Sequence, residues 1–176
     1  NMVSFRAEAV GIRDDMFLGA GNAYMREVGA ALDDGFANGV LPQRPAVINL
    51  QCDIDHPFQT LADLMTIREE FGRNLKGKKI AVTWAYAPSY AKPMSVPQGL
   101  ITLMPRFGLD VVLAHPPEWK LMKEPMAFAR EQAAAHGTSF EVTDDMDAAC
   151  RDADIVYAKS WGIEALFHKP QEALEL

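Results

Sequence analysis

Several features that mark particular classes of protein are missing from this sequence. It has two cysteines, Cys52 and Cys150, and neither stands in a Cys-x-x-Cys pair or at the spacing of a zinc site. No apolar run reaches the roughly 18 residues of a membrane helix. No cluster of Lys and Arg occurs, and the formal net charge is −7. We therefore expect no metal site, no membrane span and no surface for nucleic acid or anionic lipid.

Patterns that could hold a cofactor are also incomplete. Gly19-Ala20-Gly21 lacks the third glycine and the strand-to-helix setting of a dinucleotide-binding fingerprint. Three of the histidines, His115, His136 and His168, have no ligand-like spacing among them. No charged-then-apolar leader opens the chain, and isolated thiols fit a reducing compartment. We expect no cofactor and a cytoplasmic location.

Both ends of the sequence look like cuts within patterned segments. Asn1 stands directly before the apolar residues Met2, Val3 and Phe5, and residues 171–176 end within a helical pattern. We therefore expect this chain to be the central part of a longer protein.

The second half of the sequence alternates regularly between strand and helix patterns. Strands are predicted at 80–84, 110–114, 139–142 and 154–158, and helices at 98–107, 118–136 and 145–151. The first half predicts a helix over 1–13 that runs into a strand at 9–13, a helix from Asn22, a loop at 35–45 and a buried strand at 46–50. Strands that alternate with helices form parallel sheets flanked by helices, so the predicted fold class is α/β.

The strongest helix signal runs from Asp55 to Gly72. Asp55 is a good N-cap, Pro57 is tolerated in the first turn, and Gly72 suits the position after the last turn. Apolar side chains recur every three or four residues, so one face of this helix is predicted to pack against the protein.

His56 and Gln59 stand three residues apart in the first turn of this helix, so they share a face. Unpaired N–H groups and the positive end of the helix dipole favour an anion or a developing oxyanion there. An imidazole N–H can donate to such an oxygen, and a glutamine oxygen can accept from a neighbouring NH₂ group. Together the two side chains could hold a carbamoyl group. Spacing alone favours a simpler interpretation, in which His56 is a second capping residue and Gln59 is solvated.

The wider segment carries a resemblance that reverses this preference. His56-Pro57-Phe58-Gln59, followed by Leu61-Ala62-Asp63-Leu64 and Thr66-Ile67-Arg68-Glu69, resembles the ornithine and aspartate transcarbamylase superfamily. The resemblance covers nearly the whole chain. It implies that His56 polarises the carbonyl of carbamoyl phosphate and that Gln59 orients its carbamoyl nitrogen. Arg13 matches a family arginine that contacts the same substrate; without the resemblance it is a surface charge at a strand end.

A second, narrower resemblance concerns the later strands and a proline-rich segment. Residues 83–86, 85–96 and 156–161 are similar to the knotted transcarbamylases, which include N-acetylornithine and N-succinylornithine transcarbamylases and a group of uncertain acceptor. In that branch a later part of the chain threads a proline-rich loop. The resemblance therefore implies a deep trefoil-type knot in the full protein. Proline fixes φ and stiffens such a loop; the alternative is a rigid turn without a function.

The same resemblance implies an acceptor site beyond the carboxyl ends of the strands, where ligands of open α/β sheets bind. Trp84, Lys92 and Lys159 are its candidate residues, and Lys159 could meet an acceptor carboxylate. On its own, Lys159 would be a solvated charge at a strand end. N-acylornithine enzymes usually carry an acidic residue at the position of Thr60, which argues against an N-acylornithine acceptor. A diamino acid such as 2,3-diaminopropionate is one candidate.

The resemblance also implies how the chain is organised. Residues 1–54 would be the C-terminal part of the carbamoyl phosphate-binding domain, 55–78 an interdomain helix and linker, and 79–176 an incomplete acceptor domain. The family's Ser-Thr-Arg-Thr-Arg and His-Cys-Leu-Pro motifs do not occur. The resemblance implies a homotrimeric carbamoyltransferase that acts on carbamoyl phosphate and an amino-acid amine. Because the two motifs are missing, we expect this chain alone to be inactive. The alternatives are another α/β enzyme or nucleotide binder, and a remnant that only assembles or binds.

Overall fold

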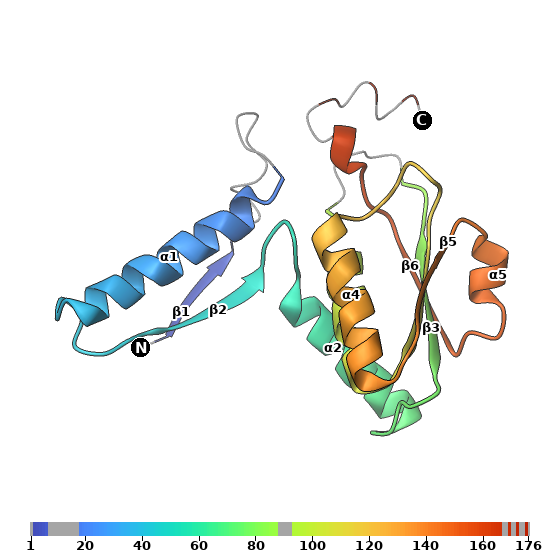
Figure 1. Cartoon of the computed structure of the whole chain (residues 1–176), viewed down its shortest axis with the longest axis horizontal. Coiled ribbons are helices and arrows are strands. Elements are labelled where there is room, and N and C mark those ends of the chain that lie inside the picture. Colours follow the sequence, from blue (N-terminus) through green and yellow to red (C-terminus); the bar gives the residue numbers. More distant parts are fainter. Residues whose placement is uncertain are drawn as a thin grey trace.

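The chain forms two parallel sheets, each with its own helices (Figure 1). The computed structural model describes residues 2–6, 18–87 and 93–166 and the single residues 169, 172 and 175. The smaller sheet is made by β1 (Met2–Arg6) and β2 (Ala46–Gln51). The larger sheet has the order β5-β4-β3-β6, with all neighbouring strands parallel. No helix of the described residues is long and apolar enough to cross a membrane.

The smaller sheet differs from the prediction at its first strand. Residues 2–6 form β1 rather than the start of a helix, with Val3 paired to Val47 of the parallel strand β2. The apolar residues Val3 and Phe5 alternate with polar ones, which is the period of a strand, and pairing with β2 completes the ladder. The predicted helix over 1–13 is therefore wrong at its start. The predicted strand at 9–13 lies outside the described residues.

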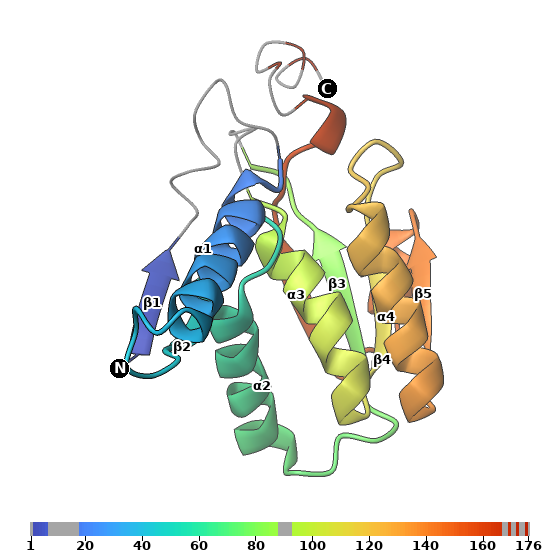
Figure 2. The ribbon, with the colours of Figure 1, turned by 60° about the vertical axis from the view of Figure 1, so that its left-hand side comes forward.

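Strand β2 has the predicted position but not the predicted burial. Residues 46–49 alternate between exposed and half-buried, Leu50 is also half-buried, and Ile48 is 36% exposed. Within the described residues, α1 (Ala20–Ala37) lies along one face of this two-stranded sheet (Figure 2). Within the described residues, this apolar strand is therefore only partly buried, whereas its composition predicted full burial.

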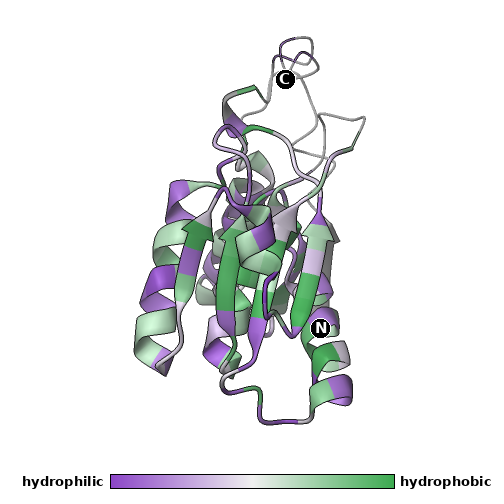
Figure 3. Ribbon diagram, turned by 90° about the vertical axis from the view of Figure 1, so that its right-hand side faces the viewer, coloured by the Kyte–Doolittle hydropathy of each residue, from purple (hydrophilic) through white to green (hydrophobic). Residues whose placement is uncertain are grey.

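The larger sheet confirms the predicted strand and helix alternation. Its strands are β3 (Lys79–Trp84), β4 (Asp110–Ala114), β5 (Phe140–Thr143) and β6 (Ile155–Lys159), each within one residue of the predicted bounds. The helices are α3 (Ser95–Leu103), continued by the 3₁₀ turn η2 (Met104–Phe107), α4 (Lys123–His136) and α5 (Met146–Cys150); the short 3₁₀ turn η3 (Glu164–Leu166) follows β6. The middle strands are largely hydrophobic (Figure 3).

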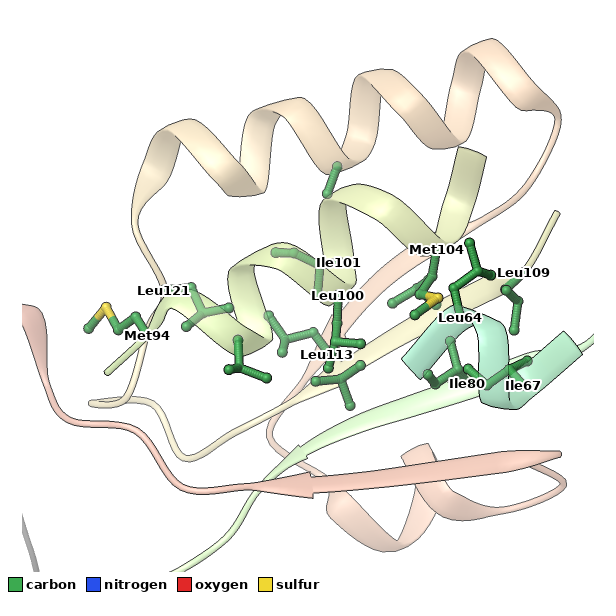
Figure 4. Close-up of a cluster of buried hydrophobic side chains, with 14 of the residues drawn as sticks. Leu64, Ile67, Ile80, Met94, Leu100, Ile101, Met104, Leu109, Leu113 and Leu121 are labelled. Carbon is green, nitrogen blue, oxygen red and sulfur yellow. The ribbon is translucent and has the colours of Figure 1, made fainter. Parts of the chain in front are cut away.

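The two faces of this sheet pack against different helices. Val111 and Leu113 of β4 join the main core with Leu100 of α3 (Figure 4), and all three are fully buried. The intervening residues Val112 and Ala114 instead pack with Ala149 of α5. This alternation is expected for a strand whose successive side chains point to opposite faces. The sheet is therefore covered on both sides, as parallel sheets generally are.

Two helices begin at other residues than predicted, because contacts distant in sequence set their boundaries. Helix α4 begins at Lys123 rather than 118, because the preceding connection turns at Pro116 and buries Leu121 in the core. Helix α1 begins at Ala20, so Asn22 is not its N-cap, and it continues through Ala37 into the predicted loop.

Helix α2 (Pro57–Phe71) lies between the two sheets and packs against α3 (Figure 2). It ends at Gly72, whose φ of 82° suits glycine, as predicted. Its N-cap is His56 rather than Asp55. The Asp55 side chain instead faces α3, where one of its oxygens would lie 2.8 Å from a Cβ added at Gly99.

Candidate active site

The candidate site begins at the N-terminus of α2, where the chain enters the helix from β2. His56 caps this helix: its Nδ1 accepts a hydrogen bond of 3.2 Å from the backbone N–H of Gln59. Because Nδ1 accepts, the neutral ring carries its proton on Nε2. The cap and the proposed chemistry therefore use different nitrogens. His56 is half-buried, and its capping bond fixes Nε2–H as a donor.

Gln59 is held in one orientation by its neighbour one helical turn later. Its Nε2 donates a hydrogen bond of 2.9 Å to Oδ1 of Asp63, and the Gln59 side chain is exposed. Within the described part of the chain, Gln59 Oε1 has no hydrogen-bond partner. The first turn of α2 thus offers a donor on His56 and an acceptor on Gln59. A planar group with a carbonyl oxygen and an NH₂ group is complementary to this pair.

Asp63 also connects α2 to the larger sheet. The hydroxyl of Tyr157, on β6, donates a hydrogen bond of 3.1 Å to Oδ2 of Asp63. Burial, followed by the charge of Asp63 and this hydrogen bond, raises the pKa of Tyr157 to about 12. Tyr157 therefore remains a hydrogen-bond donor at any physiological pH. Asp63 and Tyr157 lie in the segments that carry the resemblance, but neither was assigned a role from the sequence; for Asp63, the spacing of four from Gln59 was a further signal.

The loop that leads into α2 is fixed by buried polar contacts. The carboxylate of Asp53 accepts from the backbone N–H groups of Gly19, Gly21 and Asn22, at distances of 2.7, 3.2 and 3.0 Å. These groups begin α1, so a side chain of the protein already satisfies that helix end.

Helix α3 also holds the loop that leads into α2. Gln98 is 1% exposed; its Nε2 donates to the carbonyl of Ile54 at 2.7 Å, and its Oε1 accepts from the N–H of Met122 at 3.0 Å. One side chain therefore ties the loop before His56 to the start of α4. This contact positions the N-terminus of α2 relative to the larger sheet.

Asp55 and Thr60 are packed between α2 and α3. Burial raises the pKa of Asp55, while a hydrogen bond from the backbone of His56 and, when the ring is protonated, the charge of His56 oppose this shift. Thr60 is 2% exposed, and its Oγ1 donates to the carbonyls of His56 and Pro57. Its methyl group closely faces Gly99. The side chain at position 60 therefore limits how closely α2 and α3 can approach each other.

The candidate acceptor residues lie at the carboxyl ends of β3 and β6, where Trp84 and Lys159 are paired in register. The indole N–H of Trp84 donates to the carbonyl of Trp161 at 3.1 Å, and its ring lies 4.8 Å from that of Trp119. Lys159 Nζ donates to the carbonyl of Ser160 at 3.0 Å. The Trp84 N–H and one side of its ring are thus already in contact with other parts of the chain.

The structure brings the predicted site residues together only in part. His56 and Gln59 meet at the first turn of α2, and Trp84 and Lys159 are neighbours in the larger sheet. Arg13 and Lys92 lie outside the described residues. In the part of the chain that the structure describes, no three His, Cys, Asp or Glu side chains gather so that they could hold a metal ion.

Comparison with known proteins identifies the family. Residues 76–173 match the family model "Aspartate/ornithine carbamoyltransferase, Asp/Orn binding domain". The chain is 62% identical, over 99% of its length, to the Escherichia coli (strain K12) protein named "Putative carbamoyltransferase YgeW", of which it covers 44%. It is 42% identical, over 69% of its length, to N-acetylornithine carbamoyltransferase of Xylella fastidiosa (strain Temecula1 / ATCC 700964), of which the match covers 36%. The chain thus spans less than half the length of these relatives.

Solved structures agree with this grouping. A crystal structure of N-acetyl-L-ornithine transcarbamylase matches with a TM-score of 0.72 and 30% identity, over 98% of this chain and 48% of that one. A mutant of N-acetyl-L-ornithine transcarbamylase complexed with carbamyl phosphate and N-succinyl-L-norvaline matches with a TM-score of 0.72 and 29% identity, over 99% of this chain and 47% of that one. The family model and these relatives together show that the chain belongs to the aspartate/ornithine carbamoyltransferase family.

Proposed function

We propose that the protein transfers a carbamoyl group between carbamoyl phosphate and the amine of an amino acid or related acceptor. The observation that carries this proposal is that the first turn of α2 presents one hydrogen-bond donor and one acceptor. His56 caps the helix through Nδ1 and keeps Nε2–H as a donor, while Asp63 turns the Gln59 amide so that its Oε1 can accept. A carbamoyl group needs one donor for its oxygen and one acceptor for its NH₂ group.

The proposed reaction proceeds by addition and elimination. The lone pair of the neutral acceptor amine attacks the carbamoyl carbon, and the carbonyl oxygen takes up the negative charge. His56 Nε2–H and Arg13 stabilise this oxyanion, and Gln59 holds the carbamoyl nitrogen. The intermediate then expels phosphate, and the amine nitrogen loses a proton. Positioning and charge stabilisation supply most of the acceleration in this scheme, since no covalent enzyme intermediate is formed.

The acceptor is proposed to lie at the carboxyl edge of the larger sheet, near Trp84 and Lys159, with Lys92 contributing from the proline-rich segment. An ammonium group at this edge suits an acceptor that carries a carboxylate. The relatives named above include N-acetylornithine enzymes. Thr60 argues against an N-acylornithine acceptor for this protein, and a diamino acid such as 2,3-diaminopropionate is one candidate.

The organisation of the whole protein belongs to the same proposal. Residues 1–54 would complete the carbamoyl phosphate-binding domain, 55–78 would link the domains, and 79–176 would form much of the acceptor domain. A homotrimer, a knotted chain and a cytoplasmic location complete the proposal. Because the chain spans 44% of its relative from Escherichia coli, its own activity is expected to depend on any flanking sequence that its source protein has.

The test is phosphate release from carbamoyl phosphate in the presence of a panel of amines. The panel contains ornithine, N-acetylornithine, N-succinylornithine and 2,3-diaminopropionate, and the protein is expressed with any sequence that naturally flanks the chain. One amine should accelerate release above the spontaneous rate, and the rate should rise with pH as that amine becomes neutral. His56→Ala should lower kcat by about 100-fold or more, the usual size for loss of one oxyanion donor.

A matched control is His136→Ala, which changes an exposed histidine at the end of α4. It should leave the rate unchanged. If no amine accelerates release and His56→Ala alters nothing, the protein is not a carbamoyltransferase, and a role in assembly or binding takes its place.

A further inference from the structure

The structure points to Asp63 and Tyr157 as positioning residues that make the site select a donor with an NH₂ group. This inference rests on the proposed function and deepens it. It concerns the choice between a carbamoyl group and an acyl group of the same shape, such as acetyl, in which a methyl replaces the NH₂.

The first step is the orientation of the Gln59 amide. A glutamine side chain can rotate so that its oxygen and its NH₂ group exchange places, and the two orientations nearly coincide in shape. Asp63 lies one turn later on the same face of α2, and its Oδ1 accepts from Gln59 Nε2 at 2.9 Å. Since a carboxylate only accepts, the opposite orientation would place Oε1 against Oδ1, and their repulsion excludes it.

The second step is the orientation of Asp63 itself. Tyr157 OH donates to the other carboxylate oxygen at 3.1 Å. Tyr157 belongs to β6, which is paired with the central strand β3, so the donor comes from the packed sheet. Asp63 is half-buried between these partners. Each of its oxygens thus has one donor, and the carboxylate is held from two sides.

The consequence is a fixed polarity at Gln59. With Nε2 committed to Asp63, Oε1 is presented as an acceptor, and an NH₂ group of the ligand can donate to it. A methyl group in the same place would bury this oxygen without a partner, which is costly. The Gln59–Asp63–Tyr157 chain therefore favours carbamoyl over acetyl donors.

This effect can be separated from simple electrostatics. Asp63 carries a negative charge near a site for an anionic ligand, so its removal should strengthen the binding of any phosphonate by the same factor. That factor cancels when two ligands of equal charge are compared. Only the ratio of their dissociation constants reports the orientation of Gln59.

The test uses two stable ligands that differ in one group. Phosphonoacetamide carries the NH₂ group, and 2-oxopropylphosphonate carries a methyl in its place. Both are titrated calorimetrically into the protein with any natural flanking sequence, and into its Asp63→Asn, Tyr157→Phe and Glu70→Gln variants. Glu70 is an exposed acidic residue on the same helix and provides the control.

The unmodified protein and Glu70→Gln should prefer phosphonoacetamide by the same factor. Asp63→Asn, whose NH₂ group can donate to Oε1 of the reversed Gln59 amide, should lower this preference about three- to tenfold, the size of one hydrogen bond. Tyr157→Phe should also lower this preference, but by a smaller factor. This variant serves as the second test if Asp63→Asn does not fold. An unchanged preference in the folded variants overturns the inference alone. Failure of the unmodified protein to bind phosphonoacetamide overturns the proposed function as well.

Discussion

The close contact between α2 and α3 gives a prediction whose size can be worked out from the structure. A Cβ added at Gly99 would lie 2.6 Å from Thr60 Cγ2 and 2.8 Å from Asp55 Oδ1. Ordinary contacts between such atoms are near 3.5–4 Å. Gly99→Ala therefore requires α3 to move away from α2 by about 1 Å, or both neighbouring side chains to shift.

The expected cost of this substitution combines two opposing terms. Overpacking a well-packed core costs about 1–3 kcal/mol. Alanine in a helix interior recovers about 0.5–1 kcal/mol relative to glycine. Gly99→Ala should therefore lower the free energy of unfolding by up to about 2.5 kcal/mol, with a central value near 1 kcal/mol. It should also reduce activity, because Asp55 directly precedes His56 and any shift displaces the cap of α2.

The assay is urea unfolding followed by circular dichroism, with Gly29→Ala as the matched control. Gly29 lies within α1, and a Cβ there would meet nothing within 4 Å, so its substitution should stabilise the protein. In a Thr60→Ser background, which removes Cγ2, Gly99→Ala should cost about 1 kcal/mol less. If Gly99→Ala stabilises the protein as Gly29→Ala does, the account of this helix contact is wrong.

Three further predictions concern polar groups around the site. Asp55→Asn should raise the free energy of unfolding at pH 7 by about 1 kcal/mol, and with it the melting temperature. This gain should vanish near pH 3. Burial raises the pKa of Asp55, so the folded state favours the protonated carboxyl group. The stability that this group contributes is fully present below its ordinary pKa of about 3.9 and is lost as the pH rises through its folded-state pKa. Between about pH 10 and 12, Tyr157 ionises in the unfolded chain but not in the folded protein, so the unmodified protein should lose stability there. After allowance for solvent screening this loss is about 1 kcal/mol. Tyr157→Phe should not show it. Gln98→Ala should lower the free energy of unfolding by about 2–4 kcal/mol in urea, because it empties a buried position and leaves the Ile54 carbonyl and the Met122 N–H without partners. A loss below about 0.5 kcal/mol would contradict the bracing role of Gln98.

The elements that were predicted correctly carry their signals in local sequence. The four strands of the larger sheet are short apolar runs between polar turns, and helix α2 is bounded by Pro57 and Gly72. Strand β1 was missed because it depends on pairing with β2, which lies some forty residues later in the chain. Local pattern alone cannot supply that partner.

The candidate site divides in the same way. His56 and Gln59 could be identified because both stand in one helical turn whose neighbouring residues resemble the family. Asp55 was a reasonable N-cap by residue type, but contact with α3 draws its side chain away and His56 takes the role. Tyr157 is 94 residues from Asp63, so their hydrogen bond follows from the fold and no spacing rule could reveal it.

The central claim is that His56 uses one ring nitrogen to cap α2 and the other to bind a carbamoyl oxygen. It is tested most directly by ¹⁵N NMR of the protein with labelled histidine rings, titrated with phosphonoacetamide at neutral pH. The account predicts that His56 is protonated on Nε2 and that its Nε2 resonance shifts on saturation, while the resonances of His136 stay in place. A His56 ring protonated on Nδ1, or a titration that leaves its resonances unmoved, would contradict the claim.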